Sequence, residues 1–164
     1  MKKNLTNMLR SALLIIAATL ALPAFAEDDA APASNMEILR DKVVADKKFV
    51  VANNMKLTEA EAKAFWPIYD AYQQDLHQIN ERLAKVINDY ALAYNKGALL
   101  DNTAKKLLDE AIAVELAEVK LKQSYAPKLS KVLPGVKVAR YLQIENKIRA
   151  IVRYELAAAI PLVE

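Results

Sequence analysis

Side chains suited to catalysis or metal binding are scarce in this chain. It contains one histidine, His77, and no cysteine. His77 precedes Glu81 by four residues, so both would lie on one face of a helix and could reach the same ion. A protein metal site needs three or four ligands, and there is neither a second histidine nor a cysteine to complete one. We therefore expect His77 to be a solvated surface residue and the protein to hold no metal.

Carboxylates gather in one later stretch of the chain, at Asp109, Glu110, Glu115 and Glu118. Helical proteins that hold two metal ions use Glu-x-x-His pairs on facing helices, and this sequence has none. The neighbouring Lys120 and Lys122 make a charged, solvated helix face the simpler interpretation.

The sequence also lacks the patterns of covalent and phosphate chemistry. No serine (Ser11, Ser34, Ser124, Ser130) has a histidine nearby or stands in a glycine elbow, and no Gly-x-Gly or phosphate loop occurs. We therefore predict that the protein is not an enzyme and that it uses no cofactor.

Composition predicts an all-α fold. The only glycines, Gly97 and Gly135, fall where helical patterns break, and Ala, Leu, Lys and Glu dominate elsewhere. Four helices are expected, and no segment shows the alternation of a strand. The first begins at Ser34, which forms a capping box with Glu37, and ends at Asn53 and Asn54. Its irregular apolar face comprises Ile38, Val43, Val44, Phe49 and Val50.

The second helix is the most regular segment. It opens with a capping box of Thr58 and Glu61 and ends at Gly97, which favours a left-handed C-terminal cap. Its apolar residues repeat at alternating spacings of four and three, the period of a left-handed coiled seam. This seam comprises Phe65, Tyr69, Tyr72, Leu76, Ile79, Leu83, Val86, Tyr90 and Tyr94.

The remaining helices complete a long, bent antiparallel hairpin and a final helix. Asp101 is the expected cap of the third helix, residues 133–135 form a turn, and the fourth helix covers about 136–158. Pro67 and Pro127 lie inside helical patterns and predict bends. The apolar tail 160–163 is expected to dock on the core or on a partner.

The third helix has a broad apolar surface: Leu107, Leu108, Ala111, Ile112, Val114, Leu116, Val119, Leu121, Tyr125, Leu129 and Val132. Because one thin hairpin cannot cover so much apolar surface, we expect a homodimer.

The N-terminus is typical of a secretory signal peptide. A basic start is followed by the apolar run 11–22, Pro23 and the small-x-small site Ala24-Phe25-Ala26. We expect cleavage after Ala26, a periplasmic location and no stable membrane insertion of the product. Residues 1–26 are then the signal peptide, 27–33 a disordered linker and 34–164 a single helical domain.

Cleavage would also change the charge of the molecule. Residues 1–26 hold three of the 23 basic residues and no acid, so the remainder carries 20 basic and 20 acidic side chains. A neutral mature chain gives no electrostatic argument for nucleic-acid binding. The charge is uneven, however, because residues 127–164 hold seven basic and three acidic side chains. This basic end could meet an acidic partner, an anionic lipid surface or the acidic half of another copy.

The layout resembles the Spy/CpxP family of periplasmic helical proteins. Leu57-Thr58-Glu59-Ala60-Glu61 matches the family's Leu-Thr-x-x-Gln motif with Glu as its last residue, and Leu133-Pro134-Gly135-Val136-Lys137 holds the position of a second copy. The similarity covers about residues 36–155, and Phe65-Trp66-Pro67 and Arg153-Tyr154-Glu155-Leu156 resemble uncharacterised proteobacterial periplasmic proteins. The resemblance implies a cradle-shaped dimer that acts as an ATP-independent chaperone or an envelope-stress adaptor.

Two functions remain open at this point. In the first, a periplasmic dimer binds unfolded or membrane-associated proteins, or a membrane sensor, without ATP. In the second, the seam from Phe65 to Tyr94 pairs structurally, as a coiled coil, with one dedicated envelope partner. The residues that we predict to contact a partner are Phe65, Trp66, Tyr69, Tyr72, Tyr125, Lys128, Lys131, Arg140, Lys147, Arg149 and Arg153.

Overall fold

A computed structural model of the chain describes residues 46–97 and 99–163. Of this part, 87% is helical and none of it is in strands. A helical segment at 46–55 is followed by α3 (Glu59–Asn95), α4 (Asp101–Ser130) and α5 (Gly135–Ala159). The predicted all-α fold with four helices is therefore confirmed. The predicted signal peptide, linker and first capping box, at Ser34, lie outside the described residues.

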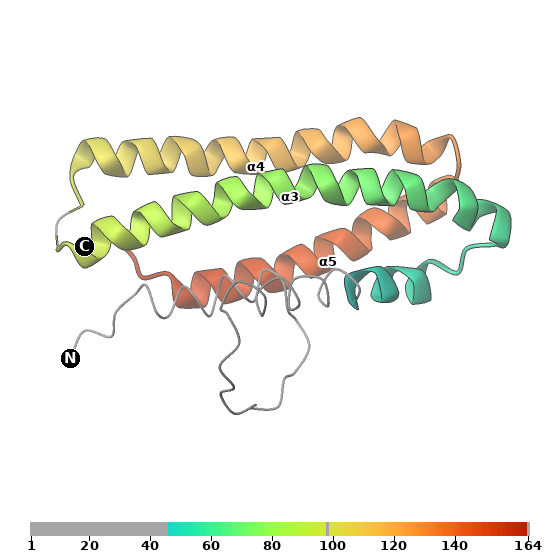
Figure 1. Cartoon of the computed structure of the whole chain (residues 1–164), viewed down its shortest axis with the longest axis horizontal. Coiled ribbons are helices and arrows are strands. Elements are labelled where there is room, and N and C mark those ends of the chain that lie inside the picture. Colours follow the sequence, from blue (N-terminus) through green and yellow to red (C-terminus); the bar gives the residue numbers. More distant parts are fainter. Residues whose placement is uncertain (1–45, 98, 164) are drawn as a thin grey trace, which may run out of the picture.

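The two longest helices form an antiparallel hairpin, and α5 returns along it (Figure 1). Pro67 and Pro127 lie within α3 and α4 rather than ending them, and Figure 1 shows α3 curved along its length. α5 leaves α4 at the short turn after Ser130 and diverges from it toward the C-terminus. The segment 46–55 lies beside the first part of α5.

The start of α3 has the predicted capping box. The Thr58 hydroxyl accepts a hydrogen bond from the Glu61 amide at 3.3 Å, and the Thr58 amide donates to the Glu61 carboxylate at 2.7 Å. Lys137 donates to the same carboxylate at 2.5 Å and to the Lys56 carbonyl at 3.1 Å. The bonds from Lys137 tie the start of α5 to the start of α3, and the hydrogen bonds that Lys137 and the Thr58 amide donate to the Glu61 carboxylate lower its pKa. At the other end of α3, Gly97 adopts a positive φ of 81° and confirms the predicted left-handed cap.

Two predicted helix ends are wrong by one or two residues. Asp101 is the first residue of α4, and Leu100 occupies the N-cap position without a side-chain hydrogen bond. The segment 46–55 continues past Asn54 because Met55 packs into the core. Its inward residues are Val51 and Met55, whereas Phe49 is exposed, so the predicted apolar face was wrong for Phe49.

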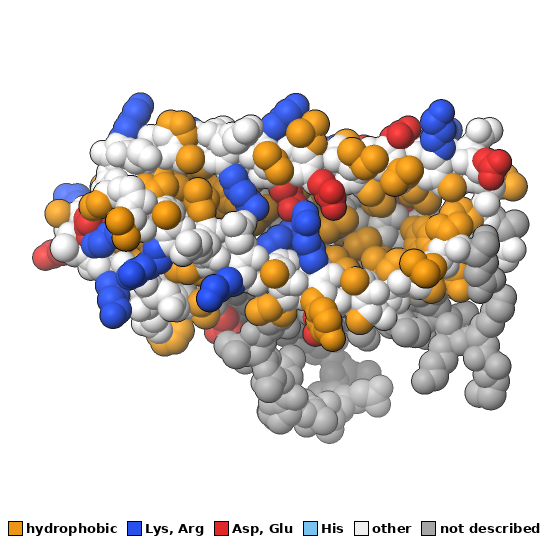
Figure 2. Space-filling view, turned by 180° about the vertical axis from the view of Figure 1, so that it is seen from behind, with side chains coloured by type: hydrophobic (Ala, Val, Ile, Leu, Met, Phe, Trp, Pro, Cys, Tyr) orange, Lys and Arg blue, Asp and Glu red, His pale blue; other side chains and the backbone are white. Residues whose placement is uncertain are grey.

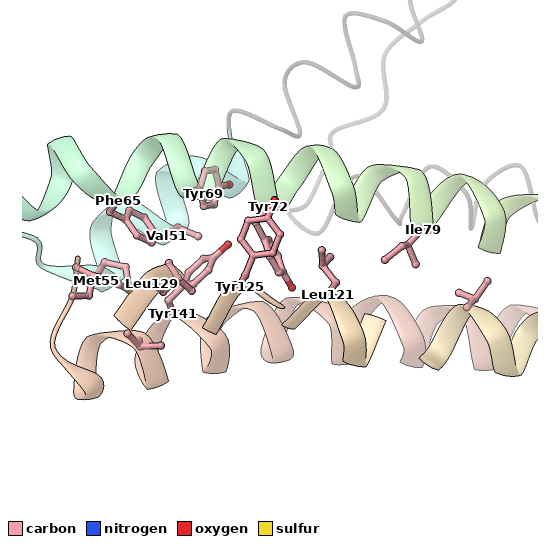
Figure 3. Close-up of a cluster of buried hydrophobic side chains, with 13 residues drawn as sticks. Val51, Met55, Phe65, Tyr69, Tyr72, Ile79, Leu121, Tyr125, Leu129 and Tyr141 are labelled. Atoms are coloured by element: carbon pink, nitrogen blue, oxygen red, sulfur yellow. The ribbon is translucent and has the colours of Figure 1, made fainter. Parts of the chain in front are cut away.

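Aromatic rings from three helices form the main core (Figure 3). Tyr141 of α5 meets Phe65 of α3 edge to face, with ring centres 5.1 Å apart. Tyr72 contacts Tyr125 of α4 at 5.3 Å and Tyr141 at 5.8 Å. Such edge-to-face pairs stabilise a core beyond the burial of area alone. The first half of the predicted seam therefore packs within one chain.

The second half of α3 packs against the end of α5 in a smaller cluster. Its buried members are Ile87 and Ala91 of α3 with Val152 and Leu156 of α5. The predicted seam named Val86, Tyr90 and Tyr94 here, and these three are only half-buried. A helix of 3.6 residues per turn drifts about 20° per heptad away from a 3.5-residue repeat, which moves the buried stripe to the next positions.

The C-terminal tail docks in part. Tyr90 donates a hydrogen bond to the Pro161 carbonyl at 2.9 Å, and Ile160 packs on the smaller cluster. Leu162 and Val163 are exposed. Among the described residues, no helix combines the length and the apolar character needed to cross a bilayer.

Candidate functional site

The aromatic residues predicted to contact a partner lie mainly in the core. Phe65, Tyr69, Tyr72 and Tyr125 are almost fully buried. Trp66 is half-buried, with the Lys48 ammonium 5.1 Å from its ring centre. Of the five aromatic residues predicted to contact a partner, only Trp66 is partly exposed.

Most of the predicted cations are at the surface. Lys128, Lys131, Arg140 and Lys147 are exposed. The Lys128 ammonium lies 3.9 Å from the centre of the Tyr125 ring, a cation–π contact that covers the ring from outside. Arg149 and Arg153 instead contact α4, as described below.

An apolar stripe runs along the exposed side of α4. Leu108, Ile112, Leu116 and Val119 recur at helical spacing, and each is 51–59% exposed. They lie on the side of α4 turned away from its buried face, which includes Val114, Leu121, Tyr125 and Leu129. At 1.5 Å per residue the stripe extends for about 17 Å, or three helical turns. We call these four residues the α4 stripe.

A groove of about 320 Å³ runs between α4 and α5 beside the stripe. Figure 2 shows hydrophobic side chains along this face, with acidic and basic side chains gathered near its middle. Its lining residues come from the middle of α4 and the second half of α5, and Figure 1 shows the two helices diverging toward the C-terminus. Val119 belongs to both the stripe and the groove. The polar lining consists of Glu115, Glu118, Lys122, Asn146, Arg149 and Arg153.

A buried carboxylate lies at the floor of this groove. Glu118 of α4 has a side chain only 5% exposed, and it forms ion pairs with Arg149 and Arg153 of α5, the latter at 3.1 Å. Arg149 also donates to the Asn80 amide oxygen of α3 at 2.8 Å. The cluster therefore joins three helices at one level. Burial and the adjacent charge of Arg153 lower the pKa of Arg149 to about 10.

A second buried carboxylate joins the other end of the bundle. Glu145 of α5 accepts hydrogen bonds from Lys47 at 2.8 Å and from Gln73 at 2.9 Å. Lys47 also donates to Gln73 at 2.7 Å, and Gln73 to the Tyr141 hydroxyl at 3.3 Å. This closed network holds the segment 46–55 against α3 and α5, so we assign it to the fold rather than to binding.

The expectation that Glu118 belongs to a solvated charged face was wrong. Glu118 continues the spacing of the buried residues Val114, Leu121 and Tyr125, and Glu145 stands four residues after Tyr141. A charged residue in register with an apolar repeat is the signal that identifies both buried carboxylates. It was masked by the cations near Glu118 in the sequence, which suggested surface pairing.

His77 lies half-buried on α3, with its imidazole 3.1 Å from the Glu81 carboxylate. Within residues 46–97 and 99–163, no three His, Cys, Asp or Glu side chains stand close enough together to hold a metal ion. The groove between α4 and α5 and the stripe beside it therefore form the candidate site.

Comparison with known proteins adds no family assignment. No protein-family model, no curated protein and no solved structure matches the chain significantly.

Proposed function

We propose that this protein is an exported, ATP-independent binding protein that holds apolar segments of unfolded or membrane-associated proteins on the α4 stripe. The observation that carries the proposal is the stripe itself, since four large aliphatic residues are exposed on a helix whose other side carries its buried residues, from Val114 to Leu129. Exposed apolar surface of this kind is uncommon on soluble monomers and marks interaction sites. The resemblance to the Spy/CpxP family supports the same function.

The position of the cations supports the choice of a protein partner. Lys128 on α4, Lys131 directly after it, and Arg140 and Lys147 on α5 are exposed, so they belong to the two helices that form the groove and the turn between them. Surface charge of one sign raises the rate of encounter with an oppositely charged partner more than it raises affinity. Capture would therefore begin by attraction and be completed by apolar contact with the stripe.

Export is part of the proposal because the N-terminal residues are typical of a signal peptide. The full-length chain should be produced in a bacterium and its mature form isolated from the periplasm. We expect an intact mass that corresponds to residues 27–164. A product that keeps residues 1–26, or that stays in the cytoplasm, would contradict the export proposal without bearing on the binding face.

Suppression of aggregation tests the binding function. A chemically unfolded client is diluted into buffer without ATP, and light scattering is followed with and without the mature protein. We expect suppression that is lost in the double variant Ile112→Ser, Leu116→Ser. Leu92→Ser is the matched control, because Leu92 is also about half exposed but lies on α3, away from the stripe.

The two variants separate the binding face from general stickiness. Suppression that survives in the stripe variant, or that falls equally in the Leu92 control, would rule out the α4 stripe as the site. No suppression by the unmodified protein at several-fold excess would rule out the general chaperone function, and pairing with one dedicated partner would then be the better account.

A further inference from the structure

The charges of the groove between α4 and α5 are not balanced. Both oxygens of Glu118 are engaged, one by Arg149 and the other by Arg153. The second carboxylate, Glu115, is 67% exposed and lies 3.9 Å from Arg153, a distance at which an exposed pair contributes little. Glu118 is thus fully paired with arginines, whereas Glu115 is only loosely held.

The cations of the groove have capacity left for another anion. Lys122 donates to the neutral amide oxygen of Asn146 at 2.7 Å, so its charge is not neutralised there. The side chain of Arg153 is 52% exposed and keeps donors accessible at the groove surface. The lowered pKa of Arg149 agrees with a crowded group of cations, since burial and the charge of Arg153 are its two main causes.

The α4 stripe lies directly beside these cations. Val119 lines the groove, and Leu116 and Ile112 follow it along α4 at one and two turns. A segment that covers the stripe therefore passes alongside Lys122 and Arg153. An acidic side chain on the edge of that segment would form charge-assisted hydrogen bonds in a partly desolvated groove, where they are stronger than in water.

We infer that the face takes an amphipathic helix of a partner protein that carries an Asp or Glu at the edge of its apolar side. The apolar side covers the α4 stripe, and the carboxylate enters the groove between Lys122 and Arg153. A helix suits the stripe because apolar residues three and four apart on a second helix can pack against a row with the same spacing. This inference rests on the proposed function and names the chemistry of the segment that is bound.

Three labelled peptides test the inference with the mature protein. They share one helix-forming sequence with apolar residues at i, i+4 and i+7, and they differ at one edge position, which is Glu, Gln or Lys. Binding is measured by fluorescence anisotropy. We expect the Glu peptide to bind about tenfold more tightly than the Gln peptide, and the Lys peptide more weakly than both. The preference should shrink at about 0.5 M salt, because the exposed cations are then screened.

Variants of the groove distinguish a specific contact from overall charge. Lys122→Gln combined with Arg153→Gln should remove the preference for Glu and leave the affinity for the Gln peptide within about twofold. Lys63→Gln combined with Lys96→Gln removes the same amount of charge from exposed positions on α3 and at its C-cap, outside the groove lining, and should keep the preference. Lys122→Glu should instead favour the Lys peptide, a gain that an unfolded variant could not show.

The outcomes also separate this inference from the proposed function. Equal binding of the three peptides, all lost in the Ile112→Ser, Leu116→Ser variant, would overturn the acidic preference and leave the binding function intact. A preference for Glu that survives the double groove substitution would move the contact elsewhere and overturn the inference. Absence of all peptide binding, together with absence of aggregation suppression, would overturn both.

Discussion

At the scale of single residues, the bundle is defined by a few polar groups placed among apolar ones. Glu118 is the clearest, because it brings a negative charge into the interior where two guanidinium groups meet it. A buried ion pair need not stabilise a fold compared with apolar residues of the same size, yet removing one partner leaves the other charge buried without compensation. The stability of this protein should therefore be sensitive to Glu118 in a way that its surface acids are not.

The first prediction follows from that asymmetry. Glu118→Gln should lower the free energy of unfolding by about 3 kcal/mol, because Arg149 loses its buried counterion. Glu115→Gln on the same helix is the control, and because Glu115 is largely exposed it should change the free energy by less than about 0.5 kcal/mol. Urea unfolding followed by circular dichroism measures both. Equal effects of the two substitutions would show that Glu118 is not buried as described.

Two tyrosines provide a second matched pair. The Tyr69 hydroxyl is buried without a hydrogen-bond partner in the described structure, whereas the Tyr125 hydroxyl donates to Asp75 at 2.7 Å. Tyr69→Phe removes an unsatisfied polar group and should leave stability unchanged or raise it by about 1 kcal/mol. Tyr125→Phe removes a bond to a charged group and should cost about 1.5 kcal/mol. Thermal unfolding of both variants would contradict this account if the order were reversed.

At the scale of helices, the ends differ in how well they are capped. α3 begins with a complete capping box, whereas the N-cap of α4 is Leu100, which has the extended backbone of an N-cap but no side chain able to accept a hydrogen bond. Leu100 is also exposed, so it contributes little packing. Local sequence chemistry therefore stabilises one helix start and leaves the other to tertiary contacts.

The third prediction uses this contrast. Thr58→Ala should destabilise the protein by about 1 kcal/mol, since it removes the acceptor for the Glu61 amide. Leu100→Asp should stabilise it by a similar amount, because a carboxylate at the N-cap can accept from amides of the first turn and faces the positive end of the helix dipole. The free energy of unfolding in urea measures both. A destabilised Leu100→Asp protein would mean that Leu100 packs against something outside the described residues.

Helix positions were more predictable than burial. The caps at Thr58 and Gly97 and the turn before α5 depend on neighbouring residues only, so the sequence was sufficient for them. Which apolar residues of α4 are buried depends on how α3 and α5 cross it, and a sequence does not contain those angles. The stripe at Leu108 and Ile112 was therefore indistinguishable from the core residue Val114 before the structure was known.

The candidate site was predictable only in part, for the same reason. Arg149 and Arg153 were expected at the binding surface, and they do line the groove. Tyr72 and Tyr125, which were also expected to contact a partner, pack on each other instead. Large aromatic side chains are rich in binding sites and in cores alike, and composition cannot distinguish the two.

At the scale of the whole molecule, the buried tyrosines couple ionisation to unfolding. Burial raises the pKa of Tyr69, Tyr72 and Tyr141 far above the ordinary value of 10.0, and burial with the hydrogen bond to Asp75 raises that of Tyr125 to about 12. A raised pKa of a tyrosine means that the folded state retains the proton more strongly than the unfolded state. This contribution to stability is complete below about pH 10 and is lost as the pH rises toward the pKa of the folded state.

The fourth prediction is thus a cooperative alkaline transition. Above pH 10 each buried tyrosine should lower the free energy of unfolding by up to about 1.4 kcal/mol per pH unit. Absorbance at 295 nm should therefore show one group of tyrosines ionising together with the loss of helical circular dichroism. Tyr141→Phe removes one such group and should make the fall in stability less steep. Ionisation of all seven tyrosines near pH 10 with the helices intact would contradict their burial.

The α4 stripe is a feature of the described part of the molecule that folding alone does not explain. Leu108, Ile112, Leu116 and Val119 are about half exposed, so replacing them should have little effect on the core. Exposed apolar residues also raise the risk of aggregation, so a stripe without a role in binding would be a liability. Stability and surface binding should therefore respond in different ways to the same substitutions.

The last prediction separates these two properties. Ile112→Ser with Leu116→Ser should change the free energy of unfolding by less than about 1 kcal/mol, while the fluorescence of a bound hydrophobic dye falls by at least about half. Val114 faces the core on the same helix. Val114→Ala should lower the free energy of unfolding by about 2 kcal/mol and leave dye binding to the folded protein unchanged. A stripe variant as unstable as Val114→Ala would mean that the stripe is covered in the folded protein, by a second copy or by another part of the chain. The dimer expected from the sequence would then be the first explanation to test, by measuring the mass of the protein in solution at several concentrations.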